Sequence, residues 1–219
     1  MAEIDGPYYI PGAPYRNLED GKGILASIEE LKTCVPYLFS VTVKGPKGEP
    51  VPHAEVDMWQ ANTAGEYHLT TYGLRGKFRT DDQGKLEILT VAPGRYGSKQ
   101  FERVSHFHLK LRDVEGKQWE DLTTQLYVLE GNNWNLMGAD IVTWWHRPNN
   151  ANMIQSWCIP SEGNKRFYDF NTVSPDEIET QKKIGWWNQR LAEANEDVNI
   201  VAGGEGEVRM NQGPRFYFF

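Results

Sequence analysis

The fold class follows from three segments: Tyr37-Leu-Phe-Ser-Val-Thr-Val-Lys44, Gly45-Pro-Lys-Gly48 and Ala54-Glu-Val-Asp-Met-Trp59. The first is rich in aromatic and β-branched residues, the second holds turn residues, and the third alternates apolar with acidic side chains. Such segments are typical of two short strands joined by a turn. The sequence therefore predicts β-structure from about residue 35 onward.

The same pattern continues through the middle of the chain. Four more strands are expected, separated by turn residues, over 76–80, 85–91, 104–111 and 122–129. Short strands at this spacing, with no helical pattern between them, favour an antiparallel β-sandwich over a βαβ sheet. We predict a mainly β protein, namely an antiparallel β-sandwich with long loops and one C-terminal helix.

The C-terminal helix is predicted from Ser174-Pro175-Asp176-Glu177, which combines an N-cap, a first-turn proline and a capping box. Five side chains then fall on one face at helical spacing: Thr180, Ile184, Trp187, Leu191 and Ala194. We expect this stripe to pack the helix against the rest of the domain.

Three parts of one domain are expected. Residues 1–24 are rich in glycine and proline and predict an extended N-terminal arm. Residues 25–172 would form the catalytic β-sandwich, with the asparagine- and tryptophan-rich segments after residue 130 as long loops. Residues 173–219 would form the helix and an aromatic tail packed on the same domain, with Gly203–Gly206 as a flexible joint.

Composition narrows the class of protein. The formal charge of −7 argues against a nucleic-acid partner, and no apolar run is long enough to span a membrane. No signal peptide is visible at the N-terminus, and Cys34 and Cys158 are too few and too far apart to predict a disulfide framework. We therefore predict a cytoplasmic protein.

Two histidines one residue apart form the centre of the expected site, in Ser105-His106-Phe107-His108-Leu109. On a strand both would point to the same face, as a pair of metal ligands would. Taken alone, such a pair is more often structural, and Tyr67 and Tyr96 alone would be core residues.

Taken together, the two histidines and two tyrosines favour ferric iron. An ordinary tyrosine has a pKa of about 10, and it ionises near neutral pH only beside a strongly Lewis-acidic cation. Two imidazoles and two phenolates would leave a trivalent ion with low residual charge and an open position. Zinc prefers cysteine or carboxylate beside histidine, and the ferrous facial triad requires one carboxylate.

These residues lie within a series of ordered motifs, in the segments Gly6–Pro14, Val56–Tyr67, Arg79–Gly84, Ala92–Tyr96, Arg103–His108 and Thr123–Gln125. The series resembles the intradiol ring-cleavage dioxygenases, which include catechol 1,2-, hydroxyquinol 1,2- and protocatechuate 3,4-dioxygenases. The resemblance covers roughly residues 6–129.

The resemblance implies a role for each matched residue. The ligands of a non-haem Fe(III) cofactor would be Tyr67, Tyr96, His106 and His108. Tyr96 would leave the metal when substrate binds, and is therefore also a catalytic residue. Substrate would be bound and activated by Arg103 and Gln125, and the cavity would be lined by Tyr8 and Pro11.

The implied reaction is cleavage of a catecholic ring, of the catechol or trihydroxybenzene type, between its two hydroxyls. Dioxygen supplies both oxygen atoms, and the product is a cis,cis-muconate-type diacid from aromatic compound catabolism. The helical N-terminal dimerisation region of catechol and hydroxyquinol enzymes is missing, and the segment 67–76 is shorter than in protocatechuate enzymes. A homodimer remains the candidate assembly.

Two other interpretations stay open at this point. The turn motifs at 48–54, 80–84 and 93–96 are also typical of transthyretin-like β-sandwich binding modules, which have no catalytic role. A zinc hydrolase built on the histidine pair would lack a third ligand and a general base. A plain sandwich has no need for Arg103 and Gln125 beside the histidines and Tyr67.

Overall fold

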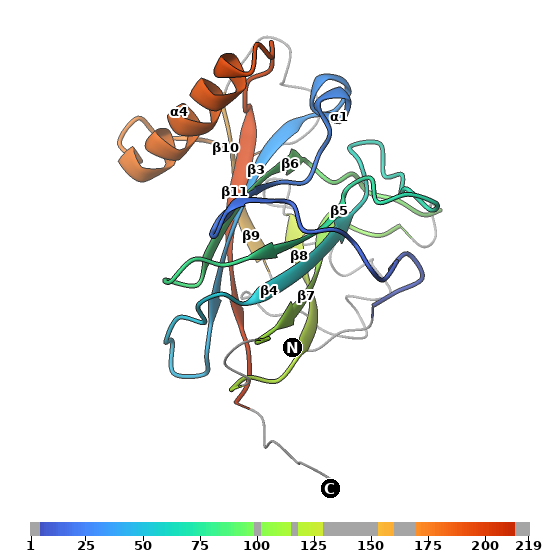
Figure 1. Ribbon diagram of the computed structural model, residues 1–219. Coiled ribbons are helices and arrows are strands. Elements are labelled where there is room, and N and C mark those ends of the chain that lie inside the picture. Colours follow the sequence, from blue (N-terminus) through green and yellow to red (C-terminus); the bar gives the residue numbers. More distant parts are fainter. Residues whose placement is uncertain (1–4, 99–101, 115–117, 129–152, 160–169, 213–219) are drawn as a thin grey trace, which may run out of the picture.

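The computed structural model describes residues 5–98, 102–114, 118–128, 153–159 and 170–212 (Figure 1). Within these ranges the chain forms one 11-stranded sheet and two helices, α1 (Ile28–Thr33) and α4 (Ile178–Glu193). The asparagine- and tryptophan-rich loops expected at 132–134 and 144–146 and the aromatic tail at 215–219 fall outside the described residues, whereas residues 153–158, also expected to lie in a long-loop region, form a strand. None of the described helices has the length and apolarity needed to cross a membrane.

The described strands follow one another across the sheet in an order far from their order in the chain. From edge to edge they are β1 (Asn17–Glu19), β2 (Lys22–Ile24), β6 (Lys85–Val91), β3 (Pro36–Lys44), β11 (Ala202–Arg209), β9 (Met153–Cys158), β8 (Leu122–Val128), β7 (His106–Arg112), β4 (Glu55–Gln60) and β5 (Arg75–Arg79), and β10 (Asn171–Thr172) pairs with β9.

The two edges of this sheet meet, so that the sheet is almost a closed barrel. The backbone N–H of Arg16 donates to the carbonyl of Lys77 at 2.9 Å, and that of Arg79 donates to the Asn17 side chain at 3.0 Å. The Asn17 amide returns a bond to the Arg79 carbonyl at 3.3 Å. The last residues of the N-terminal arm therefore form the β1–β2 hairpin, which belongs to the sheet and covers the edge strand β5.

The mainly β prediction with a C-terminal helix is confirmed, but the expected antiparallel sandwich does not form. Four pairings in the described sheet are parallel: β3 with β11, β8 with β9, β2 with β6 and β9 with β10. The longest of them runs from Ala202 opposite Tyr37 to Arg209 opposite Lys44. The longest parallel pairing arises because β11, from the C-terminal part of the chain, inserts between β3 and β9.

The prediction of a flexible joint at Gly203–Gly206 was wrong, because these residues lie inside β11. Their glycines make room for large neighbours on the sheet. A Cβ atom at Gly203 would overlap the indole of Trp157, and one at Gly204 would overlap the hydroxyl of Tyr37. Glycine inside a strand is a known mark of such close approach.

The interior of the curled sheet is apolar. Phe107 of β7 lies 4.5 Å from Phe39 and 5.6 Å from Tyr37, ring centroid to ring centroid, so β7 and β3 face each other across the core. Strand side chains alternate, so the neighbours of Phe107, His106 and His108, point to the outer face. This alternation places the expected site on the outside of the sheet.

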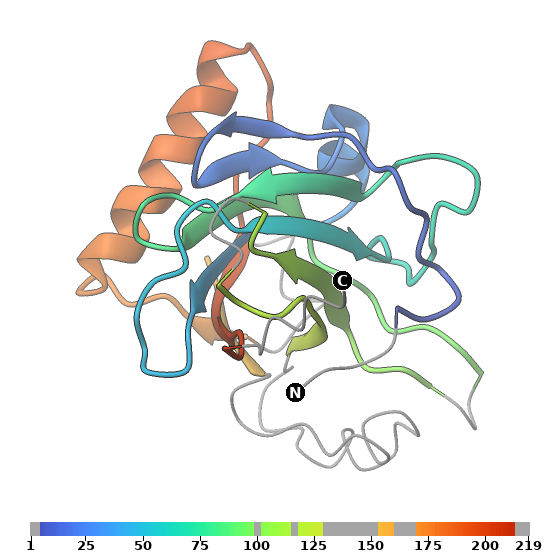
Figure 2. The ribbon, with the colours of Figure 1, turned by 60° about the horizontal axis from the view of Figure 1, so that its bottom comes forward.

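A second apolar layer lies between the sheet and the helices. Leu38 and Leu89 of the sheet pack in one cluster with Ile184, Trp187 and Leu191 of α4. Figure 2 shows α4, in orange, running along one side of the sheet. The predicted helical stripe therefore packs as expected through its three middle residues.

The start of α4 differs from the prediction. The helix begins at Ile178, and its N-cap residue Glu177 makes no side-chain capping bond. Side-chain bonds form instead in the turn before the helix. There the Ser174 hydroxyl accepts a hydrogen bond from the N–H of Asp176 at 3.2 Å, and the Glu177 carboxylate accepts one from the N–H of Ser174 at 2.9 Å. They stabilise the turn that leads into the helix.

We predict opposite effects of the same substitution at two glycines. Gly203→Ala should lower the free energy of unfolding by about 1–3 kcal/mol, because the new methyl group meets the packed Trp157 ring. Gly185→Ala is the matched control: it lies in α4 with open space around it, and should be neutral or raise stability by up to about 1 kcal/mol. Urea denaturation of both variants measures the difference. Equal stabilities would contradict the packing role of Gly203.

Candidate active site

His106 and His108 lie side by side on the outer face of β7. Their Nε2 atoms are 3.0 Å apart. His106 is only 2% exposed and His108 only 3%, although both side chains point away from the core. The outer face of β7 is therefore covered at this point, and the two imidazoles meet in a water-poor environment.

Tyr67 and Tyr96 bring their hydroxyls to the two histidines. The Tyr67 hydroxyl lies 3.2 Å from Nε2 of His108, and the Tyr96 hydroxyl lies 3.5 Å from Nε2 of His106. Atoms that each lie about 2 Å from one metal ion are separated by about 3 to 3.5 Å. The four residues thus have the spacing of a metal ligand set, and we call them the Tyr–His cluster.

The backbone fixes which nitrogen of His106 carries the proton. Its Nδ1 lies 2.6 Å from the carbonyl oxygen of Val104, and a carbonyl can only accept. Nδ1 of the neutral ring must therefore be the N–H donor, which leaves a lone pair on Nε2. This is the arrangement that metal-binding histidines use to orient the ligand atom.

His108 is held in another way. Its Nδ1 is buried and has no hydrogen-bond partner among the described residues. Burial, together with His106 nearby, lowers the pKa of His108 well below the usual histidine value, so the ring is neutral. The imidazole stacks on Trp59, with ring centroids 4.7 Å apart and planes only 5° from parallel.

The surroundings of Tyr67 favour the neutral phenol in the absence of a cation. Burial and the neighbouring Tyr96 raise the pKa of Tyr67 above its usual value, and Arg103 and Arg75 act in the opposite direction. Ionisation of this phenol therefore requires a further positive charge at the cluster. The donor set and its burial fit a strongly Lewis-acidic metal ion.

Arg75 is a buried cation behind Tyr67. Only 1% of it is exposed, and its guanidinium donates to the carbonyl of His68 at 2.8 and 3.3 Å. Burial lowers the pKa of Arg75, while the attraction of Tyr67 and Asp57 opposes this shift. Arg75 therefore fixes the backbone that follows Tyr67.

Arg103 and Gln125 lie together beside Tyr96. The Arg103 guanidinium donates to Oε1 of Gln125 at 2.8 Å and to the Tyr96 hydroxyl at 3.3 Å. Two backbone hydrogen bonds of 2.7 and 3.3 Å also join Arg103 to Tyr96. The structure thus brings Arg103 and Gln125 next to Tyr96, whose hydroxyl faces His106.

The N-terminal arm covers the Tyr–His cluster with Tyr8. The Tyr8 ring stacks on Tyr67 with centroids 4.3 Å apart and planes at 15°, and it meets Tyr96 edge-on at 5.8 Å. Pro11 is placed differently, because its carbonyl accepts a hydrogen bond from the exposed Tyr72 at 3.0 Å. Of the two cavity-lining candidates, the structure therefore brings Tyr8 to the cluster.

Charged and polar residues anchor the arm to the outer face. Lys110 donates to Asp5 at 2.8 Å, and Thr123 donates to the same carboxylate at 3.0 Å. The Tyr9 hydroxyl donates to Asp57 of β4 at 2.9 Å. These contacts lie on both sides of Tyr8 in the chain, and they hold it against Tyr67.

Three neighbours of the cluster were missed from the sequence: Trp59, Arg75 and Tyr127. Trp59 pairs with His108 across β4 and β7, and Tyr127 pairs with His106 across β7 and β8. The Tyr127 hydroxyl also lies 3.4 Å from Oε1 of Gln125. Alternation within each strand identifies these positions only once the pairing register is known.

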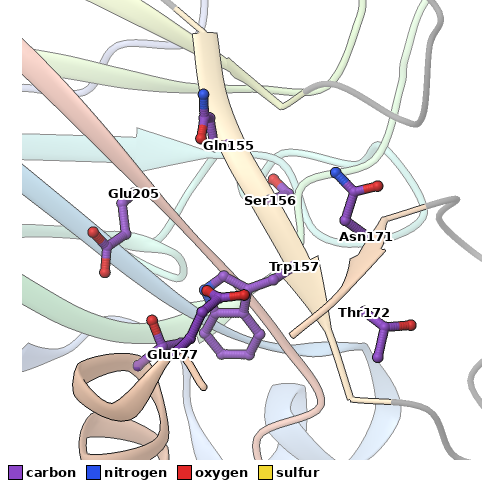
Figure 3. Close-up of a pocket in the computed structure, with 8 residues that line it drawn as sticks. Gln155, Ser156, Trp157, Asn171, Thr172, Glu177 and Glu205 are labelled. Atoms are coloured by element: carbon purple, nitrogen blue, oxygen red, sulfur yellow. The ribbon is translucent and has the colours of Figure 1, made fainter. Parts of the chain in front are cut away.

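A separate pocket of about 210 Å³ lies among β9, β10, β11 and the start of α4 (Figure 3). Its lining contains no residue of the Tyr–His cluster. Both of its carboxylates are already engaged, since Glu177 accepts from the Ser174 N–H at 2.9 Å and Glu205 pairs with Lys183 at 2.6 Å.

Comparison with known proteins gives a consistent result. A family model described as dioxygenase matches residues 4–174. Catechol 1,2-dioxygenase 1 of Acinetobacter lwoffii is 36% identical over 101 residues, which cover 43% of this chain and 31% of that protein. Chlorocatechol 1,2-dioxygenase of Pseudomonas putida is 30% identical over 151 residues, which cover 60% of this chain and 54% of that protein. The chain thus spans less than two thirds of either relative.

A solved structure of similar size shares the fold. It is the dioxygenase domain of a dioxygenase carbohydrate-binding protein fusion from Streptomyces sp. SirexAA-E. The TM-score is 0.59 at 22% sequence identity, and the match covers 96% of each chain. At this identity the likeness concerns the fold alone.

We predict a pH-dependent effect of Asp57→Asn on stability. Burial raises the pKa of Asp57, against the lowering effects of the Tyr9 hydrogen bond and Lys77. A carboxyl whose pKa is higher in the folded state stabilises the fold below its unfolded pKa, and this contribution is lost as pH rises through the folded value. The unfolding free energy of the wild type, relative to the variant, should therefore fall as pH rises above the ordinary aspartate pKa of about 3.9. Urea titrations test this, and a constant or rising difference would contradict it.

Proposed function

The chain belongs to the intradiol ring-cleavage dioxygenase family, whose model covers residues 4–174, and on that premise we propose that it is a non-haem iron(III) intradiol dioxygenase. The substrate would be a catechol or trihydroxybenzene, cleaved between its two hydroxyls with O2 to a cis,cis-muconate-type diacid. The observation that carries the proposal is the convergence of two tyrosine hydroxyls on two imidazole nitrogens within 3.0 to 3.5 Å.

The iron would be held by the Tyr–His cluster, that is by Tyr67, Tyr96, His106 and His108. The Nδ1–H of His106 donates to the carbonyl of Val104, which leaves the lone pair on Nε2 of His106 available. The neutral ring of His108 adds a second imidazole. The two phenols would bind after losing their protons, which gives a hard, anionic donor set suited to a trivalent ion. Bound there, ferric iron would withdraw electron density from a catecholate and so prepare the ring for reaction with dioxygen.

Tyr96 would act as the base that takes a proton from the substrate. Its hydroxyl lies at the edge of the cluster and accepts from Arg103 at 3.3 Å. The Arg103 guanidinium would therefore remain as a donor to the Tyr96 oxygen when substrate is bound. Positioning of this base next to the substrate hydroxyl is the geometric requirement for such a transfer.

Arg103 would place a fixed positive charge where negative charge develops on the substrate. Gln125 holds the guanidinium from one side at 2.8 Å, and the Tyr127 hydroxyl approaches the same amide oxygen at 3.4 Å. A preorganised charge in a water-poor site needs little reorganisation during the reaction, and is an effective way to stabilise a transition state.

Tyr8 would form one wall of the substrate site, since its ring already packs flat against Tyr67. A planar catecholic ring favours contacts of this aromatic kind. We also propose a homodimer, and, on the composition of the chain, a cytoplasmic location. Oxygen uptake with catechol, hydroxyquinol, protocatechuate and methoxylated analogues would identify the substituents that the site accepts.

Two tyrosinate ligands on ferric iron would give the protein a colour. Tyrosinate-to-iron charge transfer should make the purified protein wine-red, and Tyr67→Phe should shift this absorption band and reduce turnover. Tyr37→Phe is a matched control, because Tyr37 is fully buried in the core and its hydroxyl bonds to Ser156. Absorption spectra and iron analysis give the measurement. A colourless protein with stoichiometric zinc and no iron would disprove the proposal and favour a zinc enzyme.

Substitution of Arg103 should separate binding of iron from catalysis. Arg103→Ala should keep the colour and lower kcat by about 10²–10³-fold, because the ligands remain and the fixed charge is lost. Arg209→Ala serves as a control, because Arg209 is an exposed arginine of β11 that pairs with Glu207 at 2.8 Å, outside the Tyr–His cluster. Unchanged oxygen uptake by Arg103→Ala would refute the role of this arginine.

A further inference from the structure

The two histidines of the Tyr–His cluster are oriented by different means. His106 is fixed by the hydrogen bond from its Nδ1 to Val104 at 2.6 Å. His108 has no such bond from its Nδ1 to any described residue. The last torsion of a histidine side chain is soft, so a ring without a bond at Nδ1 needs another restraint to keep Nε2 in place.

Trp59 provides a flat surface against the His108 ring. The two residues oppose each other in the β4–β7 register, and their rings lie 4.7 Å apart at 5°. Rotation of the imidazole about its last torsion would break this parallel contact and drive the ring edge into the indole. Close packing makes such a clash costly.

The indole is itself held in place. Tyr9 packs on Trp59 with ring centroids 4.8 Å apart, and the Tyr9 hydroxyl is bonded to Asp57. Only 1% of Trp59 is exposed, and its Nε1 has no hydrogen-bond partner among the described residues. The position of Trp59 is therefore set by packing, and its described contacts are with aromatic rings.

We propose that Trp59 is a positioning residue that fixes the His108 imidazole by stacking, in place of the hydrogen bond that orients His106. The proposal rests on the proposed function in so far as His108 is an iron ligand. Trp59 does not touch the reacting atoms, and it acts through the direction of His108 Nε2. Its loss should weaken metal binding, whereas loss of an equally buried tryptophan outside the cluster should not.

Three variants test this effect on iron. Trp59→Leu removes the flat ring, Trp59→Phe keeps a smaller one, and Trp187→Leu makes the same change at an equally buried tryptophan of α4 outside the cluster. Competition with a chelator should show about a tenfold loss of iron affinity in Trp59→Leu, the usual size for groups that orient a ligand. Trp59→Phe should lose less, and Trp187→Leu should bind iron like the wild type.

A second measurement needs no metal. In the metal-free protein, nitrogen NMR of the imidazoles should show one fixed His108 ring in the wild type and an averaged ring in Trp59→Leu, with His106 unchanged. If the wild type binds no iron, the proposed function fails, and this comparison still decides the role of Trp59. If Trp59→Leu does not fold, Trp59→Phe decides it in the same two measurements. Wild-type iron affinity together with an unchanged His108 ring would overturn the proposal.

Discussion

The packing of Phe107 against Phe39 determines on which face of the sheet the candidate active site lies. The two rings are 4.5 Å apart in the core, and they hold the inward side of β7. A slip of one residue in the β7 register would turn His106 and His108 into the apolar interior and Phe107 outward. Burial of Phe107 thus opposes a one-residue slip, in which the ligand atoms could not meet Tyr67 and Tyr96.

An outer face would normally be wet, and the N-terminal arm changes this. Asp5 pairs with Lys110 and Tyr9 bonds to Asp57, so Tyr8 is held flat against Tyr67. Removal of water strengthens charge interactions at the cluster and raises the pKa of Tyr67. The N-terminal arm therefore excludes water from the site, and for the same reason its phenols need a nearby cation in order to ionise.

Local periodicity and the ordered motifs together account for what the sequence could predict. Alternation placed both histidines on one face, and the helical stripe of Ile184, Trp187 and Leu191 packs as expected. Pairings between distant segments could not be predicted in this way. The insertion of β11, with glycines that accommodate Trp157, and the stacking of Trp59 on His108 each depend on a register that no local pattern contains.

The two halves of the cluster differ in what holds them, and the difference matches the proposed chemistry. Tyr67 and His108 lie between the rings of Tyr8 and Trp59, and such packing resists movement. Tyr96 has the Arg103 guanidinium as a hydrogen-bond partner and stands on a segment outside the regular strands. A hydrogen bond can be exchanged for one to a substrate oxygen at little net cost, whereas a packed ring cannot leave without opening a cavity. The ligand proposed to move therefore lies in the half of the site that hydrogen bonds hold.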